Sequence, residues 1–445
     1  MRSSATGWRR TRAAQRCLAL WACLIASAPA WASDSTPPAR YLGAASCASS
    51  ACHGSTQGFS GSEIGHDEYL IWQRRDRHSR AYLSLLTPAS EAIAAALGAV
   101  PAHEDPQCLA CHASAGLAAE QGPRFQIRDG VDCETCHGPA SDWIKPHTVG
   151  LRSEAQRNEQ GLHPTWNAPD RAQLCVSCHV GDREHPISHA VMAAGHPPLN
   201  FELDTYLAVM PPHHRPEKAA ALGKPATTPL EHWRVGQGAA ARALLERVHE
   251  LAESPSVLPD FGLFDCYACH HDLQLSRWQR GRAPGLQVGE LRLADSALMS
   301  LQLWLDAGNS EWAKDWAQAR ASLNASLNRG NPSELIKHRK QLLDLQARIP
   351  WRLTDSGGEL DQIMKLIQVA GTRYRSDFAL AQQAAMLAGV LAEQLSTGER
   401  IAGAELDSAL ETLRDSVSDS LAFEPERYAN ANYRFRMLVQ SIIDN

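Results

Sequence analysis

Four short segments share the pattern Cys-x-x-Cys-His, namely Cys108–His112, Cys133–His137, Cys175–His179 and Cys266–His270. The pattern is typical of c-type haem attachment, in which two thiols add to the two vinyl groups of haem. The histidine that follows is then held under the ring, where it binds the iron. A zinc half-site, a redox dithiol or a disulfide could explain one such pair. However, zinc spacings do not require a histidine directly after the second cysteine. Four repeats therefore predict covalently bound haem c.

A fifth, less regular segment has four residues between its cysteines and ends in Cys52-His53-Gly54, as the Cys133–His137 segment ends in Cys-His-Gly. A longer loop can still present two thiols, although a local disulfide or two free thiols is the alternative. Numbered along the chain, the first motif is Cys47–His53 and the fifth is Cys266–His270, which predicts about five haems. The predicted attachment residues are Cys47, Cys52, Cys108, Cys111, Cys133, Cys136, Cys175, Cys178, Cys266 and Cys269, with His53, His112, His137, His179 and His270 as proximal iron ligands.

The N-terminus has the composition of a removable signal peptide. A basic stretch is followed by the largely apolar residues 17–28, which are too few to span a bilayer, and Ala30-Trp31-Ala32 is a small-x-small cleavage pattern. We therefore expect residues 1–32 to be a signal peptide and the mature chain to start at Ser33, in the periplasm of a bacterium. A retained membrane anchor is the alternative. No later segment approaches a transmembrane run, so we expect no span in the mature chain.

Cleavage would leave ten cysteines, all of them in the five motifs. It would also remove five arginines and no acidic residue, which takes the formal net charge from −6 to −11. An acidic protein is a poor partner for nucleic acid. The charge is compatible with docking to basic redox partner proteins, whose identity as donor and acceptor the sequence does not specify.

Cysteine and histidine divide the chain into two parts. Residues 33–285 hold all ten mature cysteines and eighteen of the nineteen histidines, and only His338 lies beyond. The first part is rich in Pro and Gly with short apolar periods, so we expect a loop-rich multihaem cytochrome domain with short helices. From about residue 290, apolar residues recur three and four apart, which indicates amphipathic helices. We expect residues 286–445 to form an all-α bundle without haem. The fold class is therefore mainly α.

Apolar stripes and breaking residues predict where the helices lie. In the first part we expect helices over Asp67–Leu86, Ala89–Leu97 and Pro229–Glu253. In the second part the stripes run over Leu291–Leu305, Phe378–Leu395 and Tyr428–Ile442, with further helices over Glu311–Leu327, Ser333–Ile349, Leu360–Thr372 and Ala404–Val417. The bundle is a structural scaffold or dimer interface in the simplest interpretation, and a docking domain for a larger redox complex in a more specific one.

Histidine is in surplus in the haem part, where thirteen histidines remain after the five proximal ligands and only Met192 and Met210 could serve as methionine ligands. The second axial ligands should therefore be mostly histidine. His/Met ligation raises the haem potential, so a bis-histidine set would lie lower. At most five of the thirteen are needed, and an isolated histidine is more often a surface or hydrogen-bonded residue than a ligand.

Over about residues 41–273 the chain resembles the multihaem c-type cytochromes of the cytochrome c-554 family. The resemblance rests on Tyr41-Leu42-Gly43, on Trp72 with His78-Ser79, on Gly130–Pro139, on Cys175–Gly181, and on His189 and His196-Pro197 leading into Phe201-Glu202-Leu203. It implies haems stacked in close pairs that pass electrons along a chain, mostly with bis-histidine irons. The fifth motif, the stretched first motif and a tail of about 160 residues are departures from the family pattern.

The resemblance also implies distal ligands position by position. His78 matches the histidine of the Trp-x5-His segment, and His147 follows the third motif. His189 and His196 stand seven apart. The fifth distal ligand comes from the pair His213-His214. We predict His214, with His213 as the alternative. We expect no iron ligation by four other histidines, His66, His103, His185 and His271.

Two classes of function follow from these residues. The first is a periplasmic electron carrier, because the chain has many predicted haems and no competing catalytic motif. The second is a multihaem oxidoreductase acting on a small nitrogen or sulfur compound such as nitrite, hydroxylamine or a sulfur oxyanion. That reaction needs one iron with an open position and nearby proton donors. No Cys-x-x-Cys-Lys variant is present, which removes one signature of a nitrite reductase but not the class. The carrier is preferred, and no catalytic residue is assigned.

Overall fold

The computed structural model describes residues 39–57, 64–114, 121–149, 153–213, 227–253, 260–266, 269–270, 290–308, 310–349, 358–397, 403–420 and 422–444. The predicted signal peptide, His214 and His271 lie outside the described residues. Within them the chain is mainly helical and contains no β-strand, only isolated bridges of Tyr41 with Gln121 and of Phe264 with Leu293. The prediction of a mainly α protein is confirmed.

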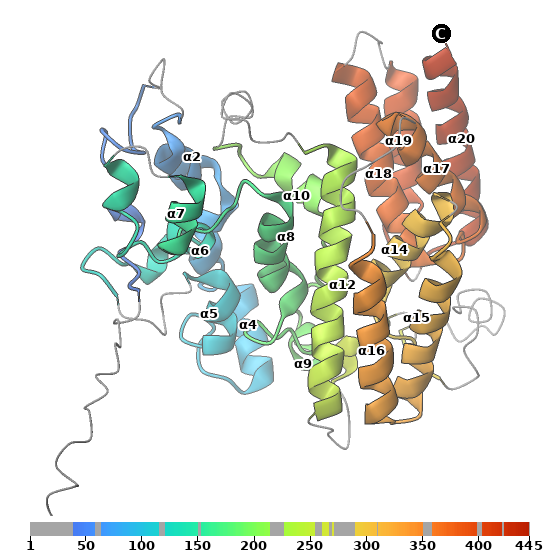
Figure 1. Cartoon of the computed structure of the whole chain (residues 1–445), viewed down its shortest axis with the longest axis horizontal. Coiled ribbons are helices and arrows are strands. Elements are labelled where there is room, and N and C mark those ends of the chain that lie inside the picture. Colours follow the sequence, from blue (N-terminus) through green and yellow to red (C-terminus); the bar gives the residue numbers. More distant parts are fainter. Residues whose placement is uncertain are drawn as a thin grey trace, which may run out of the picture. The chain divides into compact units, whose positions relative to one another are not determined.

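Short helices carry the part of the chain that holds the motifs (Figure 1, blue to green). The predicted helix Asp67–Leu86 is divided, because Asp76 adopts an extended backbone and its side chain accepts a hydrogen bond from the His78 amide. The helices are α2 (Glu68–Arg75), α3 (Ala81–Ser84), α4 (Pro88–Leu97), α5 (Pro106–His112), α6 (Cys133–His137), α7 (Glu154–Glu159), α8 (Ala168–Val176), α9 (His189–Ala193) and α10 (Leu203–Val209), with 3-10 turns at Ala44–Ser46, Arg77–Arg80, Ile127–Asp129, Pro146–Thr148 and Phe261–Leu263 and a π turn at Ser177–Gly181.

Longer helices follow, and they match the predicted spans closely. Pro229–Glu253 is confirmed with the same bounds, because its apolar stripe ends just before Pro255. The stripe predicted from Leu291 is helical only from Ser296, since residues 292–294 pair with residues 263–265 instead. The long helices are α12 (Pro229–Glu253), α14 (Ser296–Ala307), α15 (Ala313–Asn328), α16 (Pro332–Gln346), α17 (Glu359–Thr372), α18 (Phe378–Thr397), α19 (Ala404–Asp415) and α20 (Pro425–Asp444).

Helix α12 lies between the short helices and the long ones (Figure 1). It packs against α8 and α10 on one side and against α14 and α16 on the other. One apolar core therefore includes Ala172 and Leu203 from the motif-bearing part together with Leu245, Leu298 and Trp316. The predicted domain boundary at residue 285 stays a prediction, because residues 271–289 lie outside the described part of the chain.

A second core joins α14 and α17–α20. Tyr428 and Phe435 of α20 are completely buried in it, as are Ile363 of α17 and Leu387 of α18. These residues recur three or four apart within their helices, so each helix buries one stripe. Among the described helices, none combines the length and apolar character needed to cross a bilayer.

Candidate haem sites

The second, third and fourth motifs lie on or at the end of short helices. At the second motif, Asp105 caps α5 by accepting a hydrogen bond from the Gln107 amide. At the third, Asp132 caps α6 through the amides of Glu134 and Thr135. Residues three and four apart lie on one face of a helix, so this geometry directs both cysteines and the following histidine to the same side. The motif sequence thus forms a local platform suited to covalent attachment.

The stretched first motif folds into a compact turn. The His53 amide donates to the Cys47 carbonyl at 3.2 Å, and the Cys52 amide donates to the Ser49 carbonyl at 2.8 Å. The extra residues are therefore absorbed locally, and His53 returns to the start of the motif. Gly54 is required here, because a Cβ at this position would lie 1.9 Å from the Ala48 carbonyl oxygen.

In the fifth motif, residues 267 and 268 lie outside the described part of the chain. The His270 amide nevertheless donates to the Cys266 carbonyl at 2.7 Å. This hydrogen bond closes one helical turn and brings His270 over Cys266. All ten motif cysteines are among the described residues, and none of them forms a disulfide there.

Four of the motif histidines face a histidine from elsewhere in the chain, and each partner was among the predicted distal ligands. The ring centres are 6.4 Å apart for His53 and His147, 6.4 Å for His112 and His196, 6.1 Å for His179 and His78, and 6.3 Å for His270 and His189.

This spacing fits one metal ion between two imidazoles. A metal–nitrogen bond of about 2 Å on each side, with about 1 Å from each nitrogen to its ring centre, separates two ligand rings by about 6 Å. The four histidine pairs are therefore compatible with bis-histidine ligation of haem iron, next to the thiols that would attach the group.

Hydrogen bonds to Nδ1 orient several of these rings. The Nδ1 atom of His53 lies 3.0 Å from Glu68 Oε2, and that of His78 lies 3.0 Å from Asp76 Oδ1. His112 Nδ1 lies 2.9 Å from Ser84 Oγ. Backbone carbonyls serve the same purpose at His147, where the Ile144 oxygen is 2.6 Å away, and at His196, where the Pro197 oxygen is 2.8 Å away. An Nδ1–H held in this way leaves Nε2 as the nitrogen that can bind a metal.

Removal from water keeps two motif imidazoles neutral. It lowers the pKa of His137 to about 4, and it lowers the pKa of His179 to about 4. A metal-ligating histidine must be neutral, so this environment favours ligation over protonation. Tyr206 lies against His179 with ring centres 4.7 Å apart and contributes to its burial.

At the third motif, His213 is the described member of the His213-His214 pair. Burial is the main cause that lowers the pKa of His137. The charge of His213 lowers it further and has a larger effect than the charges of His53, His163 and His147. The chosen residue, His214, lies outside the described residues. His213 therefore lies near His137, whereas the choice between His213 and His214 stays open.

Thiols of different motifs also meet. The thiols of Cys47 in the first motif and Cys133 in the third lie close enough for each to shift the pKa of the other, and so do those of Cys111 in the second and Cys178 in the fourth. Cys136 of the third motif lies close enough to Cys175 and Cys178 for their charges to act on it. Groups attached at these cysteines would accordingly be neighbours. The spacing of the motifs along the sequence does not predict which of them are neighbours in space, because the paired motifs lie far apart along the chain.

Sequence reasoning identified no partners for the remaining histidines. His185 pairs with Asp182, with Nδ1 2.8 Å from Oδ1, and His103 lies 3.6 Å from a carboxylate oxygen of Glu104. The His66 Nδ1 contacts the Cys52 carbonyl at 2.6 Å. These three histidines are not members of the four ring pairs given above, and their place outside the ligand set stays a prediction.

Sequence reasoning also missed a half-buried chain of polar residues near the fourth motif. His232 Nδ1 lies 3.0 Å from Asp204 Oδ1, and its Nε2 lies 2.9 Å from an Arg171 guanidinium nitrogen. Arg171 stands one helical turn before Cys175 on α8. Asp204 lies on α10 and His232 on α12, so only the packing of these helices brings the three residues together.

Comparison with known families agrees with these features. Residues 46–138 match the family model described as cytochrome c554 and c-prime, which covers the first, second and third motifs. The match supports a c-type cytochrome with covalently bound haem c and an electron-transfer activity, in a family that is typically extracytoplasmic. No curated protein and no solved structure matches the chain.

Proposed function

We propose that the protein is a periplasmic multihaem cytochrome that carries electrons along about five covalently bound haems, most of them with histidine on both sides of the iron. The observation that carries this proposal is the set of four histidine pairs with ring centres 6.1–6.4 Å apart. Each pair joins one motif histidine to one of the surplus histidines. Haem iron supplies the one-electron redox chemistry, and the protein sets its ligation, burial and spacing.

The proposed ligand pairs combine distant segments of the chain. His78 serves the fourth motif rather than the first, which it follows most closely in sequence. We assign His213 to the third motif, because its charge lowers the pKa of His137 more than the charges of His53, His163 and His147 do. The proposed pairs are His53 with His147, His112 with His196, His137 with His213, His179 with His78, and His270 with His189.

The contacts between motifs support an order of sites that differs from their order in the sequence. Mutual effects on thiol pKa values indicate that the first motif lies near the third, the third near the fourth, and the fourth near the second. The second and fifth motifs are linked through their partner histidines: His196 pairs with the second motif and His189 with the fifth. His189 begins helix α9, and His196 follows just after its end. We propose that electrons travel along the order first, third, fourth, second, fifth, and that partner proteins dock at its two ends.

The proposed layout assigns residues 33–285 to the haem-bearing part and residues 286–445 to a helical part that contains one histidine and no cysteine. The mature chain would begin at Ser33. Mass spectrometry of the protein purified from a periplasmic extract tests this start, and a chain that still contains residues 1–32 would contradict it.

The decisive experiment is the EPR spectrum of the oxidised protein, integrated against its haem content. We expect five haems per chain and low-spin signals that account for all of the iron, because every iron has two strong ligands. A substantial high-spin fraction would contradict the carrier and favour an oxidoreductase with an open iron.

Mass spectrometry after trypsin digestion, which locates haem on each motif peptide, tests whether the stretched first motif is loaded.

A further inference from the structure

The fifth motif differs from the second, third and fourth in the way the chain supports it. Cys266 follows a short extended segment rather than a capped helix. That segment pairs with residues from the C-terminal side of the motif: Phe264 bridges Leu293, and the Asp265 amide donates to the Arg292 carbonyl at 2.9 Å. Residues 260–266, the segment ahead of the fifth motif, are thus held by the chain that leads into α14.

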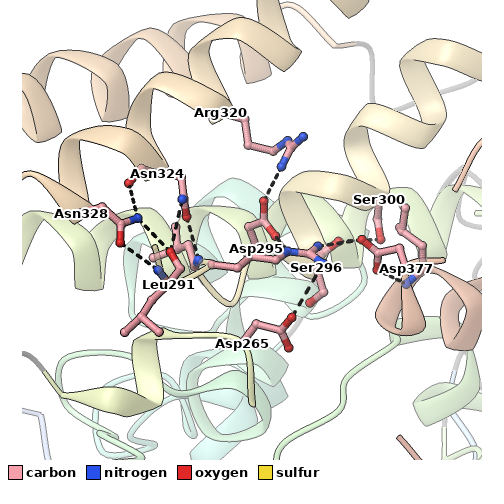
Figure 2. A network of polar contacts seen from close by, with 12 residues as sticks. Asp265, Leu291, Asp295, Ser296, Ser300, Arg320, Asn324, Asn328 and Asp377 are labelled. Carbon is pink, nitrogen blue, oxygen red and sulfur yellow. Dashed lines mark hydrogen bonds and ion pairs between the residues drawn. The ribbon is translucent and has the colours of Figure 1, made fainter. Parts of the chain in front are cut away.

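Figure 2 shows a buried ion network that extends this pairing and includes Asp265, Asp295 and Asp377. Arg292 stands at its centre. The residue is 7 % exposed, and its guanidinium contacts three carboxylates. Its Nε lies 2.8 Å from Asp295 Oδ1, its Nη2 lies 2.8 Å from Asp377 Oδ2, and its Nη1 lies 3.7 Å from Asp265 Oδ2. One side chain therefore links the segment ahead of the fifth motif to the start of α14 and the start of α18.

The partner segment is itself fixed by α15. The Leu293 amide donates to Asn324 Oδ1 at 2.8 Å, and the Leu291 amide donates to Asn328 Oδ1 at 2.8 Å (Figure 2). Arg320, also on α15, contacts Asp295 Oδ2 at 2.7 Å. Residues 291–293 thus form a rigid edge of the helical part, against which the segment ahead of the fifth motif lies.

Both histidines of the fifth site depend on that segment. The His189 amide donates to Asp260 Oδ1 at 2.9 Å, and its ring lies edge-on to Phe261 at 5.9 Å. His270 follows Cys266 by one turn and faces the His189 ring. A displacement of residues 260–266 would move the supports of both rings at once.

We infer that Arg292 is a positioning residue for the fifth haem site, through which the C-terminal helices keep His189 and His270 at the spacing for two-sided iron ligation. The inference rests on the proposed function, because it requires haem at the fifth motif. A guanidinium suits this position since its planar fork can contact several carboxylates at once, whereas an ammonium is a point charge. The helical part then has a specific role: it completes a redox site although it carries no haem motif itself.

The test compares two glutamine variants of the full-length protein. Arg292→Gln removes the contact with Asp265, whereas Arg436→Gln removes an arginine of α20 that lies outside this network and donates to Asn432 Oδ1 at 3.0 Å. In the EPR spectrum of Arg292→Gln we expect high-spin signal from one iron per chain, with the others still low-spin. Arg436→Gln should keep the wild-type spectrum. Identical spectra for the two variants would overturn the inference.

A second pair of variants decides the question if Arg292→Gln does not fold. Asp265→Asn breaks only the contact toward the fifth motif, at a side chain that is 29 % exposed, and Asp377→Asn breaks only the contact toward α18. We expect the signal of one haem to change in Asp265→Asn and none to change in Asp377→Asn. Wild-type spectra for both variants would overturn the inference.

The haem content of the wild-type protein separates this inference from the proposed function. Free thiols at Cys266 and Cys269 in the wild-type protein would contradict both. A wild-type protein with five low-spin haems, combined with variants that do not differ in their spectra, would overturn the role of Arg292 alone.

Discussion

At the scale of single residues, several of the proposed ligands are oriented by the group on their other ring nitrogen. Glu68 and Asp76 hold Nδ1 of His53 and His78, and a backbone carbonyl does the same at His147. Such contacts fix the tautomer and the rotation of the ring about the metal–nitrogen bond. The rotation is visible in the pairs: the rings of His53 and His147 are inclined by 7°, whereas those of His112 and His196 are inclined by 83°.

The inclination of the two rings predicts two classes of EPR signal. Near-perpendicular ligand planes leave two iron d orbitals close in energy, which makes the low-spin signal more anisotropic than parallel planes do. We expect the pairs at 74° and 83° to give the more anisotropic class, and the pairs at 7° and 24° to give the ordinary rhombic class. Spectra recorded at several potentials resolve the classes. A single class covering all irons would contradict the ring orientations.

Replacement of one distal ligand tests the pairing directly. In His147→Met a thioether would replace an imidazole opposite His53, and methionine ligation raises the haem potential. We expect one of the haem potentials to rise by on the order of 0.1 V, a fraction of the range of about 0.8 V that axial ligands span. Spectroelectrochemical titration measures it. The control is His103→Met, at a histidine that pairs with Glu104, and it should leave every potential in place.

At the scale of elements, buried polar contacts join the motif helices to distant loops. Glu134 of α6 is 1 % exposed, and its carboxylate accepts hydrogen bonds from the amides of Leu42, Gly43 and Ala140 at 2.8, 2.6 and 2.7 Å. The third motif is thereby tied to the chain just ahead of the first motif, which explains how two motifs far apart in sequence keep their thiols in contact.

Glu134→Gln should destabilise the protein, because an amide offers one acceptor oxygen where the carboxylate offers two. Loss of one hydrogen bond to a charged group in a buried site costs about 2 kcal/mol. Thermal or urea unfolding followed by circular dichroism measures the change. Glu91→Gln is the matched control, at an exposed position in the first turn of α4, and it should change the stability by less than about 0.5 kcal/mol. Equal stability of the two variants would contradict the role of Glu134.

Close helix packing gives a second prediction at this scale. A Cβ at Gly371 of α17 would lie 2.3 Å from Oδ1 of Asn432, a completely buried residue of α20 that donates to the Ile367 carbonyl. Gly371→Ala should therefore lower the free energy of unfolding by about 1–3 kcal/mol through overpacking. Gly403→Ala, where a Cβ meets nothing within 4 Å, serves as control. A Gly371→Ala variant as stable as Gly403→Ala would argue against this contact.

At the scale of the whole molecule, the Arg292 network makes stability depend on pH. Burial alone would raise the pKa of Asp295, but the charges of Arg292 and Arg320 outweigh it and hold the pKa below its usual value of 3.8. A depressed carboxyl pKa contributes stability that is fully present above the unfolded value and is lost as the pH falls through the folded value.

We therefore expect the free energy of unfolding to decrease as the pH falls below about 3.8, beyond the decrease due to surface carboxylates. Asp295→Asn should remove part of this slope, because the asparagine does not titrate. Urea unfolding at several pH values between 5 and 2.5 measures it. The result that contradicts the prediction is the same slope in the wild type and the variant.

The sequence by itself determined the chemistry and most of the elements. Cys-x-x-Cys-His spacing is a local property of the chain, so the sequence alone predicts the attachment residues and the proximal histidines. The stripes of α12, α17 and α18 are local as well, which is why their predicted bounds agree with the structure within one or two residues. The resemblance to the cytochrome c554 family, read from the same local segments, agrees with the match over residues 46–138.

Only the tertiary structure decided which residues meet. The pairing of His78 with His179, the contact of Cys47 with Cys133, and the attachment of the fifth motif to Arg292 all join segments far apart in sequence. No periodicity encodes such contacts, because they depend on how separate helices and turns pack together in the folded chain. The division of the predicted helix at Asp76 has the same origin: its carboxylate holds both the amide and the ring of His78, and this outweighs the local helical pattern.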